Sequence, residues 1–242
     1  MGDTYDFEPP HHYYEITQEM VDPTWLNKRI GLAISDKIDG EYIRSDKPIL
    51  LPRNYPSWDS TITTNPTVVI KNNGETFMLY KSKKKDLNSG DNNPLQIGIA
   101  HASIPEGPYQ RLSDGPILDI PGIALEDPYV WYDEKRNVFC ALMKDCVGNI
   151  SGAWGNLIYT ESEDCKNFKI DENPTVIRRL ITWEDGKKTL QCNLERPCIL
   201  FDDNNQPAYL FCASGNGDRP FFFEDESYVV CIKLEKREQH EN

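Results

Sequence analysis

The chain has 242 residues, of which 38% are hydrophobic, and a formal net charge of −13 at pH 7. This charge argues against a nucleic-acid partner, which favours a basic surface, and it suits a neutral or cationic ligand. No apolar run approaches the roughly 20 residues that a membrane-spanning helix requires, so no membrane partner is expected.

The chain begins with residues 1–6, Met-Gly-Asp-Thr-Tyr-Asp. This stretch has neither the basic region nor the apolar region of a signal peptide. The sequence as written therefore predicts a cytoplasmic protein, and a longer natural N-terminus would leave the location open.

The first predicted strands lie at 29–35 and 40–44 and form part of a repeat. The segment 29–35 parallels 96–102, and the segment 40–50 parallels 107–118, and both matches start at an offset of 67 residues. These front segments are expected to form only the third and fourth strands of a four-stranded unit, because segments matching the first two strands are missing ahead of them.

Three fuller units follow, made of short β-rich segments separated by Gly, Asn, Asp and Pro turns. Their predicted strands are 67–70, 76–80, 96–101 and 109–112; then 129–132, 138–143, 157–160 and 168–170; then 198–201, 208–212 and 228–234. Four-stranded antiparallel units repeated around an axis are typical of a β-propeller, with the first strand of each blade lining a central channel.

The predicted fold is therefore all-β: an incomplete β-propeller of the five-bladed type, with about three and a half blades in one domain. We expect a partial blade at 1–52, blades at 53–118, 119–182 and 183–236, and a tail at 237–242. An open propeller exposes two sheet faces, which favours a homo-oligomer or a second chain that covers them.

The strongest signal is a motif that precedes the first strand of each fuller unit. It reads Thr64-Asn65-Pro66, Glu126-Asp127-Pro128 and Glu195-Arg196-Pro197, and the prolines are 62 and 69 residues apart. The long polar connections 82–95, 146–156 and 214–227 should lie on the same face as these motifs. Polar groups ringed by long loops indicate a pocket.

Three acidic residues are candidates for catalysis. Glu126 and Asp127 at the mouth of an inner strand could supply a general acid whose pKa is raised by burial and a neighbouring charge. The other interpretation makes them structural acceptors in the channel. Asp145 ends the paired strand, where it could modulate this pair or simply cap a loop.

Other polar residues on the same face are candidates for binding substrate. Asn65 can hold a hydroxyl group, and Glu195 with Arg196 could bind substrate or form an internal ion pair. Asp59, Lys81 and Lys144 could also contact substrate, and the two lysines could instead remain solvated cations.

Two tryptophans, Trp58 and Trp183, lie on the predicted connections between blades, on the pocket face. They could stack on sugar rings or pack between blades. The seven cysteines include no C-x-x-C pair, and the four histidines show no metal-ligand spacing. Buried thiols in a reducing compartment are therefore expected, with no disulfide framework, no metal and no cofactor.

Several of these pieces together resemble the five-bladed propeller glycosidases of the family 43 type. The pieces are Ile30-Gly31-Leu32-Ala33, Trp58-Asp59, Gly107-Pro108-Tyr109 and the three proline motifs. The resemblance implies an inverting glycosidase with a base on the first blade, a pKa-tuning Asp on the third and a general-acid Glu on the fourth. The acid of that family commonly lies in a Glu-Gly-Pro triplet, which Glu126-Asp127-Pro128 matches, while the tuning Asp falls on Asn65.

The resemblance places the base on a blade that this chain does not contain. A substitute could come from Asp59, from Asp145 or from a partner chain. The expected function is hydrolysis of a plant or microbial oligosaccharide or polysaccharide, with Glu126 as proton donor. The alternatives are a carbohydrate-binding module without activity, an inactive truncated glycosidase, and a phosphorylase on the related scaffold.

Overall fold

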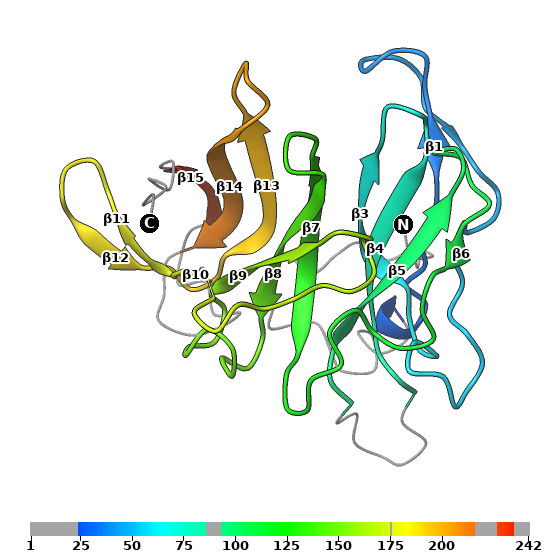
Figure 1. Cartoon of the computed structure of the whole chain (residues 1–242), viewed down its shortest axis with the longest axis horizontal. Coiled ribbons are helices and arrows are strands. Elements are labelled where there is room, and N and C mark those ends of the chain that lie inside the picture. Colours follow the sequence, from blue (N-terminus) through cyan, green and yellow to red (C-terminus); the bar gives the residue numbers. More distant parts are fainter. Residues whose placement is uncertain (1–23, 86–92, 175, 216–226, 235–242) are drawn as a thin grey trace.

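The computed structural model describes residues 24–85, 93–174, 176–215 and 227–234 of the chain. The expectations for residues 1–6 and for the tail at 237–242 lie outside these ranges. Apart from a short helical turn at residues 24–26, the elements are β-strands, and every strand pairing is antiparallel (Figure 1). The predicted all-β class is confirmed.

The front of the described chain forms a two-stranded sheet. Its strands are β1 (Ala33–Ile34) and β2 (Ile43–Arg44), and a further bridge joins Ile30 to Leu50. The sequence predicted two paired strands here, and the structure confirms the pairing with shorter strands.

The next sheet has four strands in the order β3-β4-β5-β6, as predicted. Their bounds are β3 (Thr64–Ile70), β4 (Thr76–Ser82), β5 (Gln96–Ala102) and β6 (Gln110–Arg111). Gly98 of β5 permits a close approach, since a Cβ there would lie 2.4 Å from the ring of Tyr80 on β4. The absence of a side chain at Gly98 therefore lets the Tyr80 ring lie across the sheet.

The middle sheet also has four strands, in the order β7-β8-β9-β10 along the chain. They are β7 (Leu125–Asp133), β8 (Val138–Asp145), β9 (Leu157–Ser162) and β10 (Val176–Ile177). The prediction of the fourth strand at 168–170 was wrong. Phe168 instead packs in the core and Lys169 makes an isolated bridge to Glu161, so β10 forms further along the chain.

The last sheet has three strands in the described residues, β13 (Glu195–Phe201), β14 (Pro207–Gly215) and β15 (Ser227–Lys233). A hairpin that the sequence did not predict precedes it, formed by β11 (Leu180–Thr182) and β12 (Lys188–Leu190). This hairpin runs across residues 182 and 183, the expected boundary between two blades.

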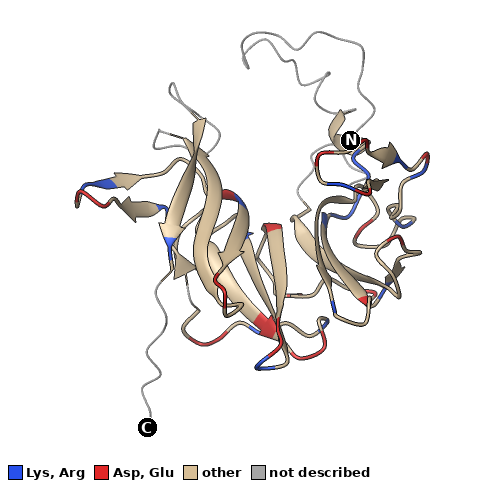
Figure 2. Cartoon of the chain, turned by 90° about the horizontal axis from the view of Figure 1, so that it is seen from above, with Lys and Arg blue, Asp and Glu red and all other residues tan. Residues whose placement is uncertain are grey.

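The inner strands of the three sheets stand side by side. Strand β7 contacts both β3 and β13, and the sheets follow one another around an arc (Figures 1 and 2). The described sheets do not close into a ring, as expected for a partial propeller. This arrangement brings the starts of three distant strands to one place.

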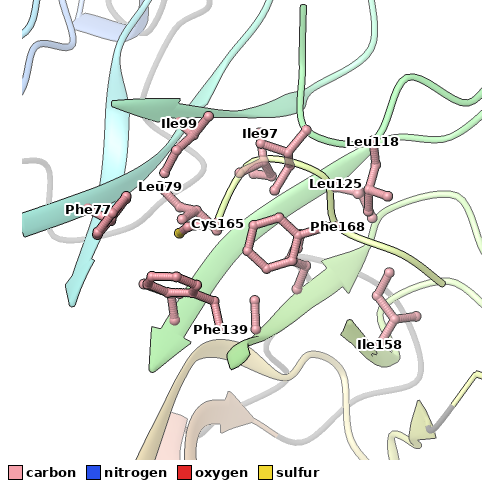
Figure 3. Close-up of a cluster of buried hydrophobic side chains, with 14 of the residues drawn as sticks. Phe77, Leu79, Ile97, Ile99, Leu118, Leu125, Phe139, Ile158, Cys165 and Phe168 are labelled. Carbon is pink, nitrogen blue, oxygen red and sulfur yellow. The ribbon is translucent and has the colours of Figure 1, made fainter. Parts of the chain in front are cut away.

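Apolar side chains between the sheets fix this arrangement. Phe77 and Leu79 of β4 lie in one buried cluster with Leu125 of β7 and Phe139 of β8 (Figure 3). A second cluster between the middle and last sheets has Leu142, Leu157, Leu194, Ile199 and Leu210 at its centre. Burying such side chains contributes about 1.5–3 kcal/mol each, so relative movement of the blades is costly.

All seven cysteines are free thiols in the structure. Cys140, Cys165, Cys192 and Cys212 are buried, whereas Cys198 and Cys231 are exposed. The expectation that the strand cysteines are buried is therefore wrong for Cys198 and Cys231, because alternate residues of β13 and β15 face outward. In the described ranges, no helix has the length and hydropathy to cross a membrane.

Candidate functional site

The three proline motifs form the same β-bulge in three sheets. In each case the residue before proline and the proline itself face one residue of the next strand. Asn65-Pro66 lies opposite Tyr80, Asp127-Pro128 opposite Met143, and Arg196-Pro197 opposite Cys212. A bulge of this kind bends the strand and redirects a side chain. The sequence repeat therefore encodes a repeated backbone irregularity at the mouth of the channel.

The residue before each proline has a left-handed backbone conformation. The φ angles are 48° at Asn65, 51° at Asp127 and 52° at Arg196. For a residue with a side chain this conformation costs about 1–2 kcal/mol, and proline further restricts the residue before it. Strain of this kind is concentrated at functional sites, and here it recurs at the three positions that vary between blades.

Asp127 connects the three bulges. Its carboxylate accepts a hydrogen bond from Nδ2 of Asn65 and one from the backbone N–H of Arg196, at 3.1 Å. Arg196 Nε also lies 3.3 Å from the Asp127 carboxylate. The side chain of Asp127 is 1% exposed. Asn65 and Arg196 thus come together on Asp127 although they belong to different sheets.

Two buried lysines link the remaining carboxylates. Lys81 Nζ lies 2.8 Å from Glu126, and Lys144 Nζ contacts Glu126 and lies 2.6 Å from Glu195. The lysine side chains are 5% and 0% exposed. The interpretation of Lys81 and Lys144 as solvated cations is therefore wrong, because each is held between sheets by carboxylates.

The two glutamates have opposite pKa shifts. Burial raises the pKa of Glu126, but the charges of Lys144 and Lys81 outweigh it and lower the pKa to about 2. Burial, together with a hydrogen bond to Asp127, raises the pKa of Glu195 to about 7 despite the nearby Lys144. The expectation of a raised pKa at Glu126 is therefore wrong, and Glu195 has that property instead.

The three carboxylates are close enough to share one bound ion. One oxygen from each of Glu126, Asp127 and Glu195 lies within 4.8 Å of the others. However, Lys81, Lys144 and Arg196 already contact these groups. The negative charge of the cluster is therefore balanced by cations of the protein, and the site needs no metal to hold its shape.

Asp145 and Asp59 are buried next to the site but bind other parts of the chain. The carboxylate of Asp145 accepts backbone N–H groups at 147, 148, 150 and 151 and the hydroxyl of Ser151. Asp59 accepts hydrogen bonds from Arg53, Arg111 and Tyr80 at 2.6, 2.5 and 2.9 Å. These contacts favour the loop-cap interpretation for Asp145 and a structural ion pair for Asp59.

Trp58 and Trp183 make packing contacts. Trp58 stacks on Tyr80, with ring centroids 6.2 Å apart, and packs against the apolar cluster around Ile30 and Leu50. Trp183 packs against the second apolar cluster, and its Nε1 donates to Thr189 in the β11–β12 hairpin. Both placements favour the packing interpretation.

Sequence reasoning missed two other tryptophans that lie against the site lysines. The ring centroid of Trp25 is 5.3 Å from Lys81 Nζ and 3.9 Å from Lys28 Nζ. The ring centroid of Trp154 is 5.7 Å from Lys144 Nζ. Trp25 precedes the first repeat unit, so the repeat pattern did not mark it. Trp154 lies in the predicted long connection 146–156, which could have singled it out.

Comparison with solved structures supports the propeller fold. The chain is 20% identical to a thermostable family-43 glycoside hydrolase, with a TM-score of 0.58 over 79% of this chain and 58% of that one. It is 15% identical to an endo-arabinase from Bacteroides thetaiotaomicron, with a TM-score of 0.52 over 78% of this chain and 62% of that one. A BT0996 RGII complex gives 16% identity and a TM-score of 0.61, over 85% of this chain and 56% of that one.

The expected likeness to family-43-type propellers is thereby confirmed at the level of the fold. The chain spans somewhat more than half the length of these solved structures. No protein-family model and no curated protein matches the sequence.

Proposed function

We propose that this chain is a carbohydrate-active domain in which Glu195 donates a proton to the leaving oxygen of a glycosidic bond. The observation that carries this proposal is the raised pKa of Glu195, about 7, in a carboxyl group that contacts Lys144 and lies beside Asp127. A general acid works best when its pKa lies near the working pH. Glu195 meets this condition, whereas Glu126, with a pKa of about 2, does not.

Asp127 tunes this acid. Its charge and its hydrogen bond both raise the pKa of Glu195, because two close carboxyl groups resist carrying two negative charges. The strained bulge and the contacts with Asn65 and Arg196 hold Asp127 in place. Glu195-Arg196-Pro197 shares the Glu and the Pro of the Glu-Gly-Pro triplet, although the resemblance to family-43-type enzymes matches that triplet to Glu126-Asp127-Pro128.

Inverting hydrolysis also requires a carboxylate base roughly 6.5–9.5 Å from the acid to activate water. Glu126 is a poor base, since its pKa of about 2 reflects tight pairing with two lysines. The carboxylates of Asp59 and Asp145 are occupied by the contacts given above. This observation favours a second candidate function, carbohydrate binding without cleavage, in which the same residues hold sugar hydroxyls.

Kinetics with substrates of different leaving groups test the proposal. The chain is assayed on aryl arabinosides and xylosides with activated and unactivated leaving groups, together with Glu195→Gln and Glu126→Gln. If Glu195 is the acid, Glu195→Gln lowers the rate on unactivated substrates about 10²–10⁴-fold and affects activated ones far less. A matched control is Glu172→Gln, which alters an exposed glutamate outside the cluster.

Two results would overturn the catalytic proposal. One is turnover that Glu195→Gln leaves unchanged on both substrate classes. The other is sugar binding without any turnover by the parent chain, which establishes the binding function instead. An absence of both binding and turnover across arabinan, xylan, galactan and galacturonan oligosaccharides would refute both functions.

A further inference from the structure

We propose that the ligand of this site is a sugar that carries an anionic group, and that Lys28 and Arg196 bind that group. This inference rests on the proposed function and narrows its substrate class. The shared chemistry is a compact oxyanion on a sugar ring, such as the carboxylate of a uronic acid or a sulfate or phosphate ester.

The balance of charge in the site supports an anionic ligand. Four cations, Lys28, Lys81, Lys144 and Arg196, interact with three carboxylates, those of Glu126, Asp127 and Glu195. Counted over these seven groups, all of which lie in the described ranges, the positive charges exceed the negative ones by one when every carboxylate is ionised, and by two when Glu195 holds its proton. A neutral sugar would leave this surplus uncompensated.

Lys28 is the site cation that no carboxylate of the described residues contacts. Among residues 24–85, 93–174, 176–215 and 227–234, none forms an ion pair with it. Its ammonium lies 3.9 Å from the ring centroid of Trp25, and its backbone carbonyl accepts the N–H of Thr63 at 3.2 Å. Burial, then the charges of Lys81 and Arg196, lower the pKa of Lys28 to about 8. An incoming anion would relieve that repulsion.

Arg196 offers a second contact for the same anion. Its side chain is 62% exposed, and Nε contacts Asp127. Within the described ranges its two terminal nitrogens have no hydrogen-bond partner. Guanidinium N–H groups bind carboxylates and phosphates through paired hydrogen bonds, and such charge-assisted bonds are about twice as strong as neutral ones. The strained bulge fixes the backbone from which this side chain extends.

The ring of Trp25 completes the proposed subsite. It lies next to Lys28 and Lys81, whose ammonium groups are 3.9 and 5.3 Å from its centroid. A flat aromatic ring provides apolar contact for a sugar, while the neighbouring cations bind its charged substituent. The chain as a whole is strongly acidic, with a formal charge of −13. Exposed charges beyond the Debye length of about 8 Å are largely screened at physiological salt, so the local surplus governs binding.

Titration calorimetry with matched sugars tests this inference. The probes are trigalacturonic acid, its methyl ester, a neutral galactotriose, galactose 6-sulfate and galactose 6-phosphate. We expect trigalacturonic acid to bind at least about tenfold tighter than its methyl ester and than galactotriose, since tenfold corresponds to only about 1.4 kcal/mol. Lys28→Gln should remove this preference, whereas Lys47→Gln, at an exposed lysine outside the site, should retain it.

The other outcomes separate this inference from the proposed function. If only the sulfate or phosphate sugar binds tightly, and Lys28→Gln loses that binding, the anion subsite is supported. The anionic group of the ligand is then a sulfate or phosphate ester and not a carboxylate. Equal binding of acidic and neutral sugars overturns the inference and leaves the carbohydrate function standing. A preference for acidic sugars that survives in Lys28→Gln also overturns it. No binding of any probe refutes the inference together with the carbohydrate function.

Discussion

Lys144 and Glu195 form a 2.6 Å ion pair across the boundary between two sheets, although they are 51 positions apart along the chain. The same ammonium also contacts Glu126 on its own sheet. One buried lysine therefore connects two carboxylates of opposite pKa behaviour. Lys81 repeats the pattern one blade earlier, where it reaches across to Glu126.

The stability of the protein should depend on pH through Glu195. Its folded pKa of about 7 lies above the ordinary value of 4.5, so the folded state holds the proton more tightly. Between these values the folded state binds more protons than the unfolded state, and the free energy of unfolding falls as pH rises, by up to about 3 kcal/mol. Urea unfolding of the parent and of Glu195→Gln measures this. The variant should show a flatter profile between pH 4.5 and 7, and an identical decline in both proteins would contradict the assignment.

Removal of the Glu126 charge should destabilise the fold. Glu126→Gln leaves Lys81 buried without a charged partner, and loss of one member of a buried ion pair typically costs about 3–5 kcal/mol. Because the folded pKa of about 2 lies below the ordinary 4.5, the same stabilisation should disappear in the parent as pH falls from 4.5 to 2. Chemical denaturation at pH 7 measures the first effect, with Glu172→Gln as control. A loss in Glu126→Gln no greater than in the control would refute the buried pairing.

The strained bulge predicts an unusual order of substitutions at Arg196. Glycine adopts positive φ without strain, so Arg196→Gly should be more stable than Arg196→Ala by about 1 kcal/mol. At Leu200, an exposed and extended position of the same strand, the order should reverse, because glycine in a strand is normally unfavourable. Thermal or urea unfolding of the four variants is decisive. Arg196→Ala equal to or more stable than Arg196→Gly would show that the left-handed conformation is absent.

The tryptophans should separate into binding and packing residues. Trp25→Ala and Trp154→Ala should weaken sugar binding about tenfold or more with little change in stability, since each loses stacking area beside a site lysine. Trp58→Ala should instead lower the free energy of unfolding by about 3 kcal/mol, because its ring packs in an apolar cluster. Calorimetric binding and denaturation of all three variants provide the test. Weaker binding in a stably folded Trp58→Ala would restore the sugar-stacking interpretation of that residue.

The repeat of the proline motif was enough to predict which strands meet. Asn65, Asp127 and Arg196 precede prolines at long, similar intervals, and the structure places Asn65 and Arg196 each in contact with Asp127. The blade boundaries were harder to predict. The position of the fourth strand of the middle sheet depends on where the chain returns to that sheet after Phe168 packs in the core. The turn residues in the sequence do not indicate where the chain rejoins the sheet.

The acid–base assignment could not be predicted from the motif. Glu126 and Glu195 occupy the same position before their prolines, yet Glu126 receives two lysines while Glu195 receives one lysine and a neighbouring carboxylate. The difference arises from lysines at the ends of second strands that reach across to the next sheet. The spacing of residues along the chain does not show which carboxylates of the neighbouring sheet these lysines contact.

The most direct measurement is the pKa of the Glu195 carboxyl group itself. A pH titration of the side-chain carboxyl carbons by ¹³C NMR, with Glu195→Gln to assign the resonance, reports it in the folded protein. We predict a transition near pH 7 for Glu195, and one near pH 2 for Glu126. A Glu195 transition at or below the ordinary 4.5 would contradict the proton-donor role.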